Sequence, residues 1–162
     1  MKHIPFLVCL FMIGACNEQS NSSDLQARID SLQNKIDNSY KPGFGEFMSS
    51  IQIHHNKLWF AGMNQNWKLA DFEIHEIQEN IDDIKEFQTE RQESKKIGMI
   101  TPALDSVTAA IEHKDIAAFK SGFIFLTNTC NDCHTSTNFE FNQVKIPDHP
   151  PFSNQVFKVN EK

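Results

Sequence analysis

The sequence predicts an all-α protein, built as an antiparallel four-helix bundle behind a short N-terminal stalk. Apolar residues recur every three or four positions along most of the chain, which is the period of amphipathic helices. No stretch alternates apolar and polar residues for long enough to predict a sheet. The 162 residues suffice for one compact core with short appendages, and not for two substantial cores.

The first residues, MKHIPFLVCLFMIGAC, have the features of an export leader. Lys2 supplies a positive charge, and an apolar run from Ile4 to Ile13 follows it. This run is too short to span the hydrocarbon core of a membrane, which needs roughly 20 apolar residues. We therefore expect residues 1–15 to be a signal peptide and the protein to be exported.

The end of the leader, Ile13-Gly14-Ala15-Cys16, resembles the lipobox of bacterial lipoprotein precursors. That resemblance implies cleavage before Cys16 and attachment of a diacylglycerol to its thiol. Several acyl chains together anchor a protein stably. The protein would then be held on a bacterial membrane, facing the periplasm or the cell surface. The alternative is an ordinary signal peptide whose removal leaves Cys16 free.

Residues 16–42 are predicted to form a tether and a short stalk. A polar run, NEQSNSSD, follows Cys16 and is typical of a flexible tether. Apolar residues then recur at spacings of four, three and four, as in the seam of a coiled coil two heptads long: Leu25, Ile29, Leu32 and Ile36. This pattern permits a homo-oligomer through residues 24–38, and equally an amphipathic helix that docks on its own domain or acts as a spacer.

The main helical domain is predicted over residues 43–162 and begins after the helix-breaking Lys41-Pro42-Gly43. Its first helix is predicted from Phe44 to about Gly62, and its second from Trp67 into the polar run 88–96. Each has one apolar face. These faces consist of Phe44, Phe47, Met48, Ile51, His55, Leu58 and Trp59 in the first helix, and of Ala70, Ile74, Ile77, Ile81 and Ile84 in the second.

Two further helices complete the predicted bundle. Thr101-Pro102 is expected to cap and start the third helix, because proline is favoured in the first turn. Asp115 is expected to cap the fourth helix, which runs toward Cys130. Short connections favour antiparallel neighbours. The tail after Thr137 is predicted to be irregular, and its aromatic residues suggest that it packs on an apolar surface.

The segment Cys130-Asn131-Asp132-Cys133-His134 is the CxxCH signature of c-type haem attachment. Thiols two residues apart on a helical turn can each reach one vinyl group of the porphyrin. His134 then lies over the ring as the proximal iron ligand. We therefore expect one covalent haem c, with Cys130 and Cys133 in thioether bonds.

Three other interpretations of these cysteines compete with haem. A thioredoxin-type dithiol would open a helix after a strand, whereas this motif closes the last predicted helix. A zinc site would need further ligands at suitable spacing, and no second CxxC exists. A disulfide within the CxxC would be strained.

The position of CNDCH on the last helix of a four-helix bundle resembles the cytochrome c′ class. The resemblance covers residues 44–137, and the segment Thr135 to Lys162 departs from it, because cytochrome c′ chains end soon after the motif. The small class I cytochromes do not fit, because their downstream methionine ligand is missing here after Met99. The segments HHNKLWFAG and PPFSNQVF also resemble a group of small exported haem proteins.

The sixth coordination position has three candidates. His55 falls inside the apolar stripe of the first helix, His54 lies at its edge, and Met63 ranks third. Glu73 lies on the apolar side of the second helix. We interpret it as a boundary carboxylate that reaches water, with a hydrogen bond to a histidine as the alternative.

The expected function is one-electron transfer by a membrane-anchored monohaem cytochrome. The alternative is a five-coordinate haem module that binds or senses small gases such as NO or CO. No catalytic base beside a substrate pocket is apparent, so we do not expect an enzyme. The net charge of −6 argues against nucleic acid as a partner, and the redox partner is not specified by the sequence.

Overall fold

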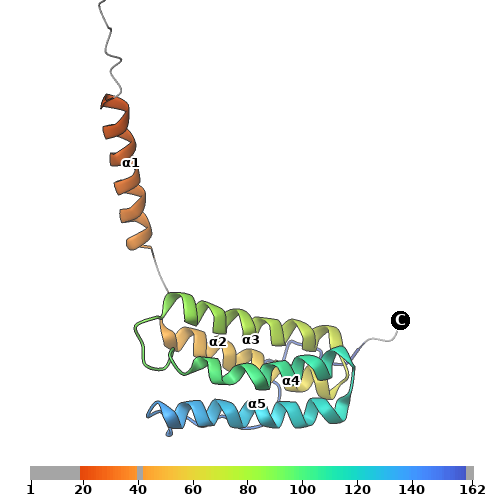
Figure 1. Cartoon of the computed structure of the whole chain (residues 1–162). Helices are drawn as coiled ribbons and strands as arrows, with labels where there is room; N and C mark the ends of the chain where they lie inside the picture. The colour runs from red at the N-terminus through yellow and green to blue at the C-terminus, as the bar shows by residue number, and fades with distance from the viewer. Residues whose placement is uncertain (1–18, 40–41, 160–162) are drawn as a thin grey trace, which may run out of the picture. The chain divides into compact units, whose positions relative to one another are not determined.

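The computed structural model describes residues 19–39 and 42–159, and within these residues the chain is all-helical, as predicted. The predicted leader over residues 1–15, together with Cys16, lies outside the described residues. The elements are α1 (Gln19–Asp37), α2 (Phe44–Met63), α3 (Trp67–Phe87), the 3₁₀-helix η1 (Ile97–Ile100), α4 (Thr101–Glu112) and α5 (Ile116–Ser136) (Figure 1).

The chain divides into two units, with α1 in the first and all other elements in the second. The helix expected over residues 24–38 is present and begins earlier, at Gln19. The second unit begins with α2. The backbone N–H of Gly43 donates to the Glu46 carboxylate at 2.9 Å, which covers one of the otherwise unpaired donors at the start of that helix.

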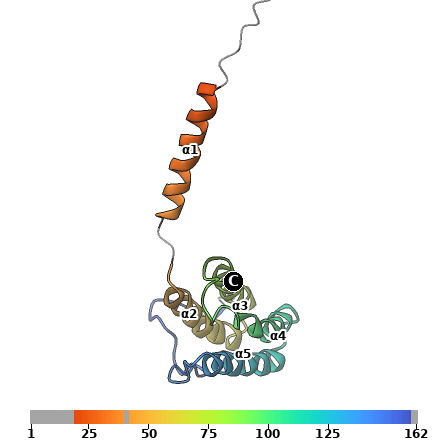
Figure 2. The ribbon, with the colours of Figure 1, turned by 60° about the vertical axis from the view of Figure 1, so that its left-hand side comes forward.

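The helices of the second unit pack around a shared apolar core. Helix α2 packs on α3, α3 on α4, α4 on α5, and α2 on α5, and the four remain side by side in both views (Figures 1 and 2). The predicted apolar stripe of α3 is fully buried. At the centre lie the largest buried side chains of α5, Phe119 and Phe123, beside Leu58 of α2.

The predicted cap of α5 is confirmed, and the predicted cap of α4 is wrong. The Asp115 carboxylate accepts hydrogen bonds from the backbone N–H groups of Ala117 and Ala118, at 2.8 and 3.0 Å. Thr101 is not the cap of α4, because the unpredicted η1 runs directly into that helix. The capping position falls on Ile100, and Thr101 is already in the first turn.

The tail after Asn138 contains no helix or strand as far as Val159, as predicted. Part of it packs on the bundle. Phe157 is buried with its ring 5.7 Å from that of Phe60, and its carbonyl accepts a hydrogen bond from the Asn66 amide at 3.2 Å. Phe141, by contrast, is 79% exposed. The tail therefore packs on the bundle through some of its residues, Phe157 and Ile146 among them, and leaves others exposed.

Candidate functional site

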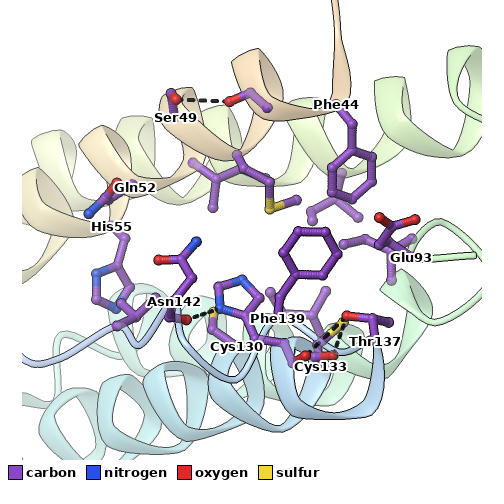
Figure 3. A pocket seen from close by; sticks show the side chains of 18 of the residues that line it. Phe44, Ser49, Gln52, His55, Glu93, Cys130, Cys133, Thr137, Phe139 and Asn142 are labelled. Atoms are coloured by element: carbon purple, nitrogen blue, oxygen red, sulfur yellow. Dashed lines mark hydrogen bonds between the residues drawn. The ribbon is translucent and has the colours of Figure 1, made fainter. Parts of the chain in front are cut away.

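A cavity of about 310 Å³ lies between the first half of α2, the segment 91–100, the end of α5 and the tail (Figure 3). Its wall is mostly apolar, with Met48 and Ile51 from α2, Ile97 from η1 and Val144 from the tail among its members. Exposed Ser49 and Gln52 also line it, so the cavity reaches the surface beside α2. A volume of this size is within the usual range of small-molecule pockets.

The structure brings all three residues of the predicted haem motif to this cavity. Cys130, Cys133 and His134 lie in the last two turns of α5 and line one end of it. The helix stops directly after them, where Asn138 adopts a left-handed conformation with φ of 65°. The backbone N–H of Phe139 then donates to the carbonyl of His134 at 2.8 Å. This turn sends the tail back along the cavity.

The ring of His134 is held by the tail. Its Nδ1–H donates to the backbone carbonyl of Asn142 at 2.6 Å. Because a carbonyl can only accept, Nδ1 carries a proton, and in the neutral ring the other nitrogen, Nε2, has the lone pair. Metal-binding histidines are oriented in this way by a backbone carbonyl on the second nitrogen. In this tautomer Nε2 is the nitrogen of His134 that could bind a metal ion.

The tail segment that holds His134 is itself fixed to the motif. The Asn131 side-chain amide donates to the Val144 carbonyl at 2.9 Å, and its oxygen accepts from the Val144 N–H at 2.8 Å. Phe139, Asn142 and Val144 all line the cavity. The predicted packing of the tail on an apolar surface thus includes this wall, although the sequence did not identify which residues make it.

The two thiols are in an environment that keeps them protonated. Burial, with a smaller effect of the neighbouring Cys133, raises the pKa of Cys130 to about 12. Burial and the Glu93 carboxylate also raise the pKa of Cys133. Within the described residues the two cysteines form no disulfide. A redox-active dithiol needs a lowered pKa, so this environment disfavours the thioredoxin-type interpretation.

His55, the first candidate for the sixth ligand, lines the same cavity and is 3% exposed. Burial lowers its pKa to about 4, so the ring is neutral at pH 7. Its Nε2 lies 2.9 Å from the Thr127 hydroxyl, which itself donates to the Phe123 carbonyl at 2.9 Å. Because the Thr127 hydroxyl donates its proton to that carbonyl, it can only accept from His55. The proton of the neutral His55 ring is therefore on Nε2, and the lone pair is on Nδ1.

The other two ligand candidates do not line the cavity. Met63 lies at the end of α2 with 36% of its surface exposed. His54 points to α3, where its Nδ1 hydrogen-bonds to Glu73 at 2.6 Å.

The preferred interpretation of Glu73 as a boundary carboxylate was wrong. The residue is fully buried, and its second oxygen lies 3.5 Å from Lys57 Nζ. Its partners on α2, His54 and Lys57, explain this burial, because a carboxylate can be buried when cations and hydrogen-bond donors take the place of water.

Two charged residues at the cavity were not identified from the sequence. Arg91 and Glu93 belong to the polar run between α3 and η1, form an ion pair at 2.7 Å and line the cavity. The Arg91 guanidinium lies 4.9 Å from the centre of the Phe44 ring. The hydrogen bond from Arg91 also lowers the pKa of Glu93. The polar run that contains Arg91 and Glu93 has the composition of an ordinary solvent-exposed loop. No feature of the sequence therefore indicated that these two residues line a cavity.

Comparison with protein-family models, curated proteins and solved structures gives no significant match for this chain. In the described residues, no three side chains of His, Cys, Asp or Glu are grouped so that they could hold a metal ion. None of the described helices is long and apolar enough to cross a membrane.

Proposed function

We propose that this chain is a membrane-anchored c-type cytochrome with one covalent haem, and that it carries single electrons. The observation that supports this most directly is the hydrogen bond from His134 Nδ1 to the Asn142 carbonyl. It leaves Nε2 as the iron-binding nitrogen of a histidine that lines one cavity with both thiols of the motif.

The residues around the cavity suit a haem. Cys130 and Cys133 would hold it by thioether bonds, and His134 would bind its iron. Met48, Ile97 and Val144 offer an apolar wall, while Arg91 is the only arginine or lysine among the lining residues and suits a propionate. The bound group would supply an iron that accepts and releases one electron. The chain would set its potential through burial, ligand identity and the hydrogen bond on His134.

The arrangement of helices we propose is an antiparallel four-helix bundle of the cytochrome c′ kind, formed by α2, α3, α4 and α5. The motif lies at the end of the last helix, as in that class. The tail is a departure from it, because Phe139, Asn142 and Val144 line the cavity. We infer that in this protein the tail covers one side of the haem.

The proposed location is a bacterial membrane, facing the periplasm or the cell surface, with Cys16 lipidated. Electron transfer would then occur near the membrane, with a redox partner protein. The net charge of −6 is compatible with a basic partner and does not suit nucleic acid.

A second candidate function is a five-coordinate haem that binds a small gas such as NO or CO. One specific observation favours it. The Nε2 of His55 is already engaged with Thr127, so the ring could bind iron through Nδ1 only, unless this hydrogen bond is broken. The apolar wall beside it would suit a small neutral ligand.

An absorption spectrum tests the proposal and separates the two functions. The full chain would be produced in a host with cytochrome c maturation, extracted in detergent and denatured. We expect haem to stay bound to the polypeptide, and a Cys130→Ala/Cys133→Ala variant to carry none. Loss of all haem from the denatured wild type would refute the haem proposal.

The same protein in its native state distinguishes electron transfer from gas binding. Sharp ferrous α and β bands that CO does not move would indicate a sixth protein ligand and electron transfer. Such bands should then disappear in His55→Leu. A broad high-spin spectrum that shifts with CO would establish the open site instead.

A further inference from the structure

Helix α1 has a single row of large apolar side chains, and all of them are exposed. Leu25, Ile29, Leu32 and Ile36 are between 53% and 58% exposed, whereas most other positions of the helix are polar. Four apolar side chains in line on a helix of 19 residues are unfavourable in water. A row of this kind is typical of a helix that packs against a partner.

The identities of these residues specify the type of partner. In heptad notation Leu25 and Leu32 occupy d positions, and Ile29 and Ile36 occupy a positions. Isoleucine at a combined with leucine at d favours two parallel strands over trimers or tetramers. We propose that α1 pairs with α1 of a second copy of this chain, as a parallel two-stranded coiled coil.

The charges beside the row favour the parallel orientation. Arg28 and Lys35 occupy g positions, and Gln26 and Gln33 occupy e positions. In a parallel pair each g position faces an e position, so Arg28 meets Gln33 of the second copy. In an antiparallel pair the g positions face each other, and Arg28 would meet Lys35 of the second copy. Like charges at these positions select against that orientation.

The remaining polar residues of α1 stabilise the helix itself. Arg28 Nε lies 3.2 Å from the Asp24 carboxylate one turn earlier, and Gln26 and Gln33 each donate to an aspartate one turn later, at 2.8 and 2.9 Å. Pairs at this spacing stabilise a helix by about 0.2–0.5 kcal/mol each. The helix is thus supported independently of the apolar row.

Two heptads make a weak coiled coil in free solution, and attachment to one membrane would compensate for this. Confinement raises the effective concentration of one copy for another. Anchors at residue 16 would also start both helices from the same surface, which matches the parallel orientation. This supporting step depends on the proposed anchor, whereas the pairing itself does not depend on haem.

Cysteine cross-linking in membranes tests the pairing in the full chain. Ser22 occupies the a position before Ile29 and is small and polar, so Ser22→Cys removes none of the apolar row. Mild oxidation should give a disulfide-linked dimer on a non-reducing gel. The parent chain reports any background from its own cysteines. The matched control is Ala27→Cys at the outward f position, which should give several-fold less dimer.

A mixed experiment tests the orientation. In an antiparallel pair Ser22 would lie level with Ser39 of the second copy. Co-expression of differently tagged Ser22→Cys and Ser39→Cys chains should therefore give little mixed dimer. Predominance of the mixed product would overturn the parallel arrangement. Equal cross-linking of Ser22→Cys and Ala27→Cys would overturn the pairing altogether, and so would the absence of every dimer, the mixed one included.

A disruptive variant supplies an independent check. Leu32→Lys places a charge in the row and should abolish the Ser22→Cys dimer, whereas Asn34→Lys adds the same charge at an f position and should not. Covalent haem is measured in the same samples. Loss of the dimer with haem retained would therefore be distinguishable from failure of the haem proposal.

Discussion

The side-chain amide of Asn131 is joined to the backbone of Val144 by two hydrogen bonds, at 2.9 and 2.8 Å. Asn131 lies inside the CxxCH motif, and Val144 lies two residues beyond Asn142, whose carbonyl holds His134. The pair therefore fixes the tail at the position where it orients the histidine. Asn131, at one of the two variable positions of the motif, thus has a definite structural role.

Replacement of Asn131 by alanine should release this part of the tail. The two hydrogen bonds contribute about 0.5–1.5 kcal/mol each, so we expect a loss of about 1–3 kcal/mol in the free energy of unfolding. Limited proteolysis should also cleave residues 138–146 faster. The control is Asp132→Ala, at the next and exposed position of the motif, which should change neither measurement. Equal effects of the two substitutions would argue against the role of Asn131.

The helices were predictable because their signal is local and repeated. The apolar row of α3, made of Ala70 and four isoleucines, has the helical period over five buried positions. Asp115 caps α5 by hydrogen bonds to residues only two and three positions further along the chain. Gly43 and the residues around it also marked a boundary between α1 and α2. Such features depend on neighbours in the chain, so the sequence alone contains them.

The site was predictable only in part. CNDCH identified Cys130, Cys133 and His134, and the apolar stripe of α2 identified His55. The hydrogen bond that orients His55 comes from Thr127, which is 72 residues away in the chain, and the one that orients His134 comes from Asn142, eight residues away in an irregular tail whose path no pattern predicts. Glu73 was misinterpreted for the same reason, although the spacing of His54 and Lys57 along one edge of α2 could have indicated its partners.

Thr127→Val tests the hydrogen bond to His55. The substitution preserves the shape of the side chain and removes the acceptor of the buried Nε2–H. A buried donor left unpaired costs about 1–3 kcal/mol, which should appear as lower stability in urea unfolding. Thr129→Val is a matched control, since Thr129 is also buried and also donates to the carbonyl one turn earlier at 2.9 Å. A cost for Thr129→Val as large as for Thr127→Val would show that His55 contributes little.

Gly62→Ala should destabilise the protein although alanine is the better helix former. A methyl group there would lie 2.1 Å from the Phe119 ring, which is itself fully buried. Overpacking of this kind costs about 1–3 kcal/mol. Gly45→Ala, in the first turn of the same helix, meets nothing within 4 Å and should be neutral or stabilising. Thermal unfolding of the two variants measures the difference, and a stabilised Gly62→Ala would mean that α2 and α5 are less closely packed there.

Lys114→Gly should stabilise the protein. Lys114 follows α4 in a left-handed conformation with φ of 55°, and its N–H donates to the Ile111 carbonyl at 3.0 Å. Glycine avoids the strain of a β-carbon in this conformation, about 1–2 kcal/mol. The greater freedom of glycine in the unfolded chain costs about 0.5–1 kcal/mol, so the net gain is about 0.5–1 kcal/mol. For a chain of this size we expect the melting temperature to rise by about 2–4 °C per kcal/mol. Glu79→Gly, at an exposed position within α3, should lower stability by about 1 kcal/mol. A fall in both variants would show that the left-handed turn after α4 is not retained in solution.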